Sequence, residues 1–129
     1  MYQTTSEESI AELVDTFYGR IRGDRLLGPI FDEAIGADWG PHLEKMKAFW
    51  STVLLASRTY KGNPMITHLL LPRLTQSHFD RWLELWRETV HALCSENIAP
   101  AFIQKAQSIG ERLLYAISTH HQWAGQGAA

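Results

Sequence analysis

Residues 75–93 read TQSHFDRWLELWRETVHAL, a stretch whose apolar side chains recur with the period of an α-helix. They fall at i, i+3, i+4, i+7, i+11 and i+14, which places them on one face of a helix. These inward residues are Phe79, Trp82, Leu83, Trp86, Val90 and Leu93. Thr75 belongs to the residue types that cap a helix N-terminus. The stretch predicts a long amphipathic helix that buries Trp82.

Two stretches nearer the N-terminus have the same period. The first is preceded by Thr5 and Glu8, which are spaced as a capping box. Its inward residues are Ile10, Leu13, Val14, Phe17, Tyr18 and Ile21. The second opens near Pro41, because proline suits the first position of a helix. Its stripe comprises His42, Met46, Phe49, Trp50, Val53 and Leu54.

A further helix is expected to start at Pro100 and to continue to about residue 118. Its inward residues are Phe102, Ile103, Ala106, Ile109, Leu113 and Ile117. A tail rich in Gly, Ala and Gln follows, and we expect it to be frayed from about residue 120. Residues 26–31 (LLGPIF) read as a tight apolar corner, in which Phe31 joins the core. With no alternating strand pattern, the sequence predicts one all-α domain over residues 1–129, with a core at about 6–118.

Composition sets limits on function. The chain has 129 residues, 45% of them hydrophobic, with a formal net charge of −2, so it lacks the basic field that binds nucleic acid or an anionic membrane. Cys94 is the single cysteine, which excludes an internal disulfide and a covalent c-type haem attachment. Residues 1–8 lack the apolar segment of a secretory signal. We therefore expect a cytoplasmic protein. The oligomeric state stays open, with a monomer favoured.

His68 lies in the stretch GNPMITHLLLP, residues 62–72, where it is surrounded by aliphatic side chains and bounded by Pro64 and Pro72. One interpretation is a haem-iron ligand, since haem needs a neutral nitrogen donor and a dry pocket. The other is a hydrogen-bonded core histidine, which is the common case for a histidine in an apolar stretch. A zinc site is disfavoured because it recruits three or four clustered ligands. The residues alone leave the first two interpretations open.

Tyr18, His42 and Trp82 are polar-tipped side chains on otherwise apolar stripes. Each needs a hydrogen-bond partner once it is buried. Plain packing, with the polar atom satisfied by backbone, is the common case for any one of them. Taken together, three such donors would suit a pocket that holds a polarised ligand such as O2.

The joint pattern resembles the truncated haemoglobins, and among them the third group. The resemblance spans roughly residues 6–118. It is carried by Phe17-Tyr18, by the corner ending at Phe31, by His42 with Phe49-Trp50, by the prolines and leucines around His68, and by Phe79-x-x-Trp82. It implies a two-over-two helical sandwich around a non-covalent haem b, with His68 as the proximal ligand.

The resemblance also implies roles for the other candidates. Tyr18, His42 and Trp82 fall at the distal positions, where they would retain O2, NO or CO. Whether His42 also ligates the iron stays open. Further haem contacts are expected from Phe31, Met46, Phe79, Lys45, Tyr60 and Arg73, the last three as partners of the propionates. By base rate alone, Phe79 is more often a core residue than a cofactor contact.

Three functional classes stay open at this point. The first is reversible O2 binding. The second is an enzyme that converts nitric oxide to nitrate with O2, or activates peroxide, and that requires an external reductase. The third is a cofactor-free helical interaction domain in which His68 is structural. An optical spectrum distinguishes the third from the others, because haem gives an intense Soret band.

Overall fold

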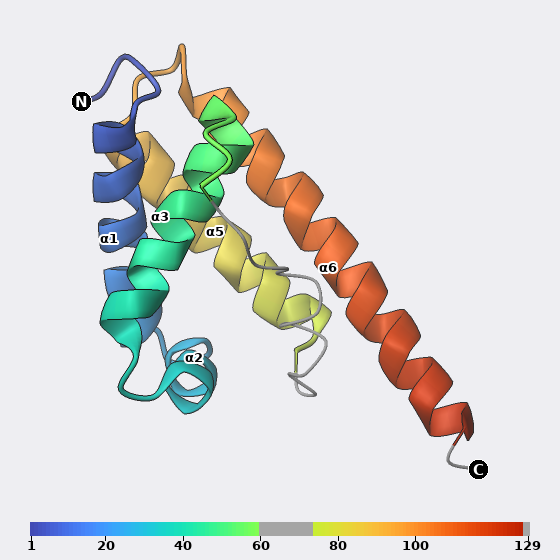
Figure 1. Ribbon diagram of the computed structural model, residues 1–129. Helices are drawn as coiled ribbons and strands as arrows, with labels where there is room; N and C mark the ends of the chain where they lie inside the picture. The colour runs from blue at the N-terminus through green and yellow to red at the C-terminus, as the bar shows by residue number, and fades with distance from the viewer. Residues whose placement is uncertain (60–73, 128–129) are drawn as a thin grey trace.

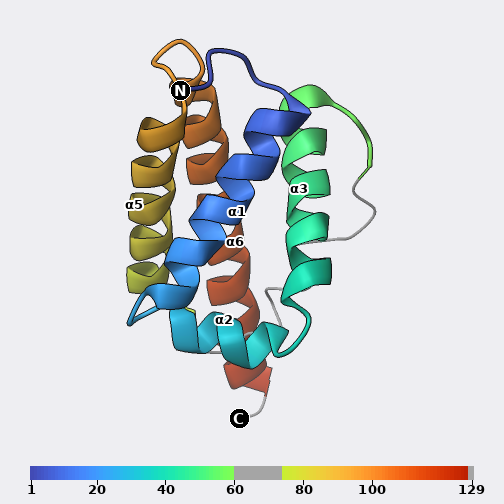
Figure 2. The same ribbon diagram turned by 90° about the vertical axis from the view of Figure 1, so that its left-hand side faces the viewer.

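The computed structural model describes the backbone of residues 1–59 and 74–127 and the side chains of residues 1–59 and 74–116. In this part of the chain all regular structure is helical, as expected. The helices are α1 (Glu7–Gly23), α2 (Gly28–Ile35), α3 (Trp39–Leu55), α5 (Gln76–Leu93) and α6 (Ala99–Gly127). Two pairs form, α1 with α3 and α5 with α6, and α1 also packs on α5 (Figure 1). Figure 2 shows α1 crossing the bundle between α5 and α3, with α2 at its lower end.

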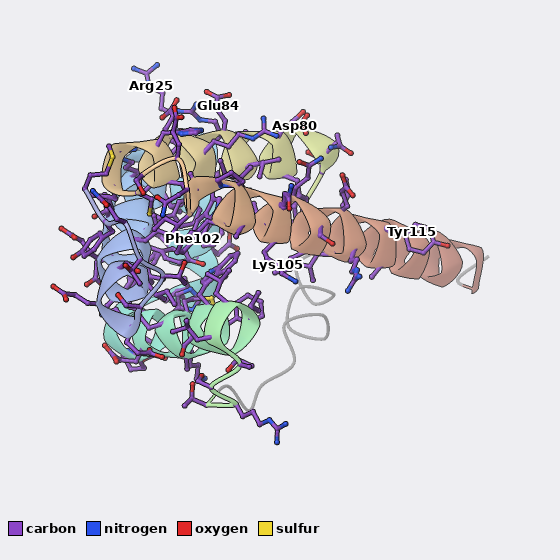
Figure 3. All side chains as sticks on the ribbon, turned by 90° about the horizontal axis from the view of Figure 1, so that it is seen from above. Arg25, Asp80, Glu84, Phe102, Lys105 and Tyr115 are labelled. Atoms are coloured by element: carbon purple, nitrogen blue, oxygen red, sulfur yellow. The ribbon has the colours of Figure 1, made fainter. Side chains whose placement is uncertain are left out.

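The centre of the bundle is aromatic. Phe17, Trp86 and Phe102, from three different helices, are fully buried. The Trp86 indole N–H donates to the backbone carbonyl of Phe102 at 3.0 Å, which satisfies the polar atom of this buried ring. Trp50 of α3 stacks on Trp86 with centroids 4.4 Å apart, so one ring contact joins the two helix pairs. Figure 3 shows Phe102 among the side chains between the helices.

The cap of α1 differs from the expected one. Ser6, not Thr5, is the N-cap, and its side chain accepts from the Ser9 N–H at 3.1 Å. The Ser9 hydroxyl oxygen accepts in return from the Ser6 N–H at 2.9 Å. The prediction of a Thr5–Glu8 capping box was wrong by one residue. A hydroxyl at the third helical position can replace the usual Glu or Gln because Ser9 is buried against the N-cap.

The corner at residues 26–31 was also predicted incompletely, because it contains the start of α2. Pro29 is the second residue of this two-turn helix, a position whose N–H needs no partner inside the helix. Gly28 allows the helix to pass close to the end of α1. A Cβ at Gly28 would lie 2.8 Å from the carbonyl oxygen of Arg22, so a larger residue would displace the backbone.

The bounds of α3, α5 and α6 test the other expectations. Thr75 is the N-cap of α5, as predicted, and its N–H donates to Nδ1 of His78 at 2.9 Å. α3 begins at Trp39, two residues before the expected start at Pro41. The backbone of α6 is helical to Gly127. Fraying of the tail from about residue 120 stays a prediction.

Helix α6 runs past the end of α5 (Figures 1 and 3). Tyr115, on this projecting part, is 75% exposed. None of the helices in the described residues is both long and apolar enough to span a membrane.

Candidate functional site

Tyr18 is the centre of an aromatic group formed by α1, α2 and α3. Its side chain is 5% exposed, and its ring meets that of His42 edge-on, with centroids 5.2 Å apart at 89°. Phe31 of α2 contacts the same ring at 6.1 Å. The structure therefore brings together two of the three expected distal residues, Tyr18 and His42, and places Phe31 beside them.

The Tyr18 hydroxyl makes no hydrogen bond with any residue that the structure describes. Burial raises its pKa above the ordinary value near 10, so the group keeps its proton at neutral and moderately alkaline pH. The Tyr18 side chain keeps 5% of its surface exposed, and its hydroxyl is not one of the fully enclosed polar atoms. This hydroxyl is therefore a donor suited to an acceptor outside the described protein atoms.

Trp82, the third expected distal residue, borders this group through Phe17. The Phe17 ring lies 5.0 Å from Tyr18 and 5.8 Å from Trp82, both in edge contacts. Trp82 also lies nearly parallel to Trp86, with the ring centroids 6.1 Å apart. No described residue accepts a hydrogen bond from the Trp82 indole N–H. Trp82 thus offers a second donor, half-buried at the N-terminal half of α5.

Trp39 is a member of the group that the sequence reasoning missed. It is 7% exposed at the first position of α3, and its ring contacts Tyr18 at 6.0 Å and His42 at 5.7 Å. Trp39, His42, Leu43 and Met46 stand at i, i+3, i+4 and i+7, so the stripe of α3 starts one turn before His42. Placing the helix start at Pro41 hid this signal.

The other expected haem contacts in the described residues differ in burial and position. Met46 is half-buried on α3 and packs against the core, whereas Lys45 is exposed. Phe79 and Trp82 line an open cavity of about 490 Å³ between α5 and α6. Gly110 of α6 forms part of its wall, and a Cβ there would only touch Phe79 at 3.5 Å. The cavity thus has a flat aromatic side on α5.

Three candidates, His68, Tyr60 and Arg73, lie outside the described residues. Their roles stay predictions.

Comparison with known proteins agrees with this arrangement. A family model described as bacterial-like globin matches residues 3–109. Over 125 residues the chain is 37% identical to the group 3 truncated haemoglobin ctb of Campylobacter jejuni, covering 92% of this chain and 98% of that protein. The chain belongs to the group III truncated haemoglobins. The expected family is therefore confirmed.

Two further similarities place this truncated haemoglobin among its relatives. The crystal structure of the group III truncated haemoglobin from Campylobacter jejuni superposes with a TM-score of 0.85 at 36% identity, covering 90% of this chain and 94% of that one. The group 2 truncated haemoglobin YjbI of Bacillus subtilis is 33% identical over 94 residues, which are 69% of this chain and 67% of that protein. The fold is thus the all-α globin fold.

Membership of the globins makes this truncated haemoglobin a haem-binding protein, and globins bind small diatomic ligands such as O2. The described residues fit that cofactor. The Tyr18 hydroxyl and the Trp82 indole N–H are hydrogen-bond donors without a described acceptor, and Phe31, Met46 and Phe79 are apolar. A porphyrin requires this combination of apolar walls and a few polar groups.

Proposed function

We propose that this truncated haemoglobin holds haem b without a covalent bond, with His68 as the proximal ligand, and retains O2 through a hydrogen bond from Tyr18. When bound, haem supplies an iron centre that takes a diatomic ligand. The observation that carries the proposal is the Tyr18 hydroxyl, which belongs to a side chain only 5% exposed and has no acceptor among the described residues. His42 and Trp82 are proposed as the residues that complete the distal side.

The Tyr18 side chain would act by holding its proton on the hydroxyl oxygen and donating it in a hydrogen bond to the ligand. Burial raises the pKa of this hydroxyl, so it stays a donor at neutral pH. The rings packed around Tyr18 limit the access of competing water, and a hydrogen bond to a charged or polarised acceptor is stronger in such surroundings. Tight retention suits ligand chemistry or sensing better than carriage.

His42 and Trp82 would support Tyr18 from two sides. The edge-on contact of the His42 ring restricts the directions in which the Tyr18 ring can turn. Trp82 lies nearly parallel to Trp86 and edge-on to Phe17, and these contacts restrict the turning of its indole. A donor whose orientation is set in advance loses little entropy on binding.

The substitution Tyr18→Phe tests the proposed donor, since it removes one hydroxyl and keeps the ring. A lost hydrogen bond of about 1.5–3 kcal/mol should raise the O2 dissociation rate roughly 10- to 150-fold, because 1.4 kcal/mol corresponds to a factor of ten. Stopped-flow measurement of O2 release gives the rate, and the Soret band reports haem content. Tyr115→Phe is the matched control, because that ring is 75% exposed. An unchanged rate in Tyr18→Phe would refute the distal role of Tyr18.

The proximal role of His68 is tested by His68→Gly. Loss of the Soret band, and its return with added imidazole, is the expected result, because free imidazole can replace the missing ring. His91→Gly, which removes a histidine from the exposed face of α5, serves as the control. A wild-type protein that stays colourless after reconstitution with hemin would contradict the proposal as a whole.

A further inference from the structure

Trp39 forms the outer member of a triangle of rings with Tyr18 and His42. The three centroid distances are 5.2 Å for Tyr18–His42, 6.0 Å for Tyr18–Trp39 and 5.7 Å for Trp39–His42. The His42 ring is perpendicular to both neighbours, so each edge rests on a face. A movement of the Trp39 indole would therefore displace both of the other rings.

The opposite side of Trp39 is fixed by residues of α1 and α2. Its indole N–H donates to Oδ1 of Asp32 at 3.1 Å, a hydrogen bond to a charged acceptor. The guanidinium carbon of Arg22 lies 4.6 Å from the centroid of the Trp39 ring, within the range of a cation–π contact. Arg22 Nε also lies 3.8 Å from the same Asp32 oxygen, so the Trp39 indole contacts both members of one ion pair.

Helix α2 connects the two sides of the triangle, because its consecutive residues Phe31 and Asp32 contact different members of it. Phe31 contacts the Tyr18 ring, and Asp32 holds the Trp39 indole. Since α2 has only two turns, both contacts depend on one short rigid body.

We propose that Trp39, clamped by Asp32 and Arg22, is a positioning residue that sets the orientation of the Tyr18 and His42 rings. Its effect on O2 retention rests on the proposed function, because it acts through the Tyr18 hydroxyl. The placement of the Tyr18 and His42 rings does not depend on the proposed function, and it can be measured separately from O2 retention. Asp32 is the member to test, because its hydrogen bond with the Trp39 N–H is direct, whereas the Arg22–Asp32 pair is long and both side chains are about half exposed, at 53% and 52%.

The experiment compares two substitutions of Asp32 in the haem-loaded protein saturated with CO. Asp32→Ala removes the acceptor of the Trp39 N–H, whereas Asp32→Asn keeps a carbonyl oxygen that can accept it. Asp15→Ala is the control, because Asp15 is also 52% exposed and its ion pair with Lys47, at 3.1 Å, joins α1 to α3 away from Trp39. The readouts are the NMR shifts of the Tyr18 and His42 ring protons, the C–O stretching band and the O2 dissociation rate.

Asp32→Ala should move the ring-proton shifts and the C–O band, and should raise the O2 dissociation rate roughly three- to tenfold, as expected for one misplaced hydrogen bond. Asp32→Asn should restore most of the wild-type behaviour, and Asp15→Ala should leave all three readouts unchanged. Trp39→Phe, which keeps a ring but loses the N–H, should raise the rate in the same way.

Unchanged ring-proton shifts in Asp32→Ala would overturn the positioning role, even with a lower thermal midpoint, because a purely structural role changes only stability. Equal shifts in Asp32→Ala and Asp15→Ala would also overturn it. If the rings move in Asp32→Ala but Tyr18→Phe leaves the O2 rate unchanged, the proposed function fails and the positioning role stands.

Discussion

Asp24, at the C-terminal end of α1, holds the corner that leads into α2. Its Oδ2 accepts from the backbone N–H groups of Leu27 at 3.0 Å and Leu26 at 3.1 Å. Its Oδ1 accepts from Nε of Arg81 on α5 at 2.8 Å. The Asp24 side chain is 7% exposed, so water replaces these contacts poorly when they are lost. The corner therefore depends on one carboxylate with three donors.

The substitution Asp24→Ala should lower the free energy of unfolding by about 2–3 kcal/mol, because it removes the acceptor of two backbone N–H groups, one of them on the buried Leu27 and the other on the exposed Leu26. The ion pair with Arg81 is left out of this sum, since Arg81 is 35% exposed and also pairs with Glu84. For a chain of this size the loss corresponds to a thermal midpoint lower by roughly 8–12 °C.

The stabilisation by Asp24 should also depend on pH. Burial alone would raise the pKa of this carboxyl, but the hydrogen bonds from Leu27, Arg81 and Leu26 outweigh it and lower the pKa below its ordinary value. Because the folded pKa lies below the unfolded one, near 3.9, the contribution is complete above about pH 4 and is lost as the pH falls through the folded pKa. The difference between wild type and Asp24→Asn should shrink in that acidic range.

Urea unfolding at pH 7, 5 and 3.5, at equal haem loading, measures both effects. Asp80→Ala is the control, because Asp80 is exposed on α5 and its loss should change stability by less than about 0.5 kcal/mol. A loss below about 1 kcal/mol in Asp24→Ala at pH 7, or the same difference for Asp24→Asn at every pH, would refute this account of the corner.

Two further substitutions test the packing that holds the site. Gly28→Ala should destabilise the fold by about 1–3 kcal/mol in urea unfolding, because its Cβ would meet the Arg22 carbonyl oxygen at 2.8 Å; wild-type stability would show that α2 can move at no cost. Trp86→Phe should lose about 2–3 kcal/mol in the same assay, through the missing hydrogen bond to Phe102 and the smaller ring against Trp50; a loss under 1 kcal/mol would contradict it.

The sequence predicted the long helices and their buried faces well, because burial itself selects the apolar period. Phe17, Tyr18 and Trp86 were expected to face inward, and each is at most 5% exposed. The period carries this information over several turns, so single exceptions do not hide it. The family resemblance was predictable for the same reason, since its residues lie along these stripes.

The ends of the helices and the short helix α2 were harder to predict. A two-turn helix has too few residues to show a period, and its Gly28-Pro29 start also reads as a helix breaker. The cap of α1 was assigned one residue too early because Thr5 and Ser6 are both capping residue types. The clamp on Trp39 could not be predicted, because Arg22 and Asp32 belong to separate helices and their contact leaves no local pattern.

The neighbouring residues Phe17 and Tyr18 of α1 lie in two different environments. Phe17 is locked between Trp82 and Trp86 in the fully buried core, whereas Tyr18 faces the rings of α2 and α3. A rotation of α1 about its axis that moved Tyr18 away from these rings would also disrupt the close packing of Phe17. On α1, an incoming ligand is therefore met by the side-chain torsions of Tyr18, while the backbone of this helix stays in place.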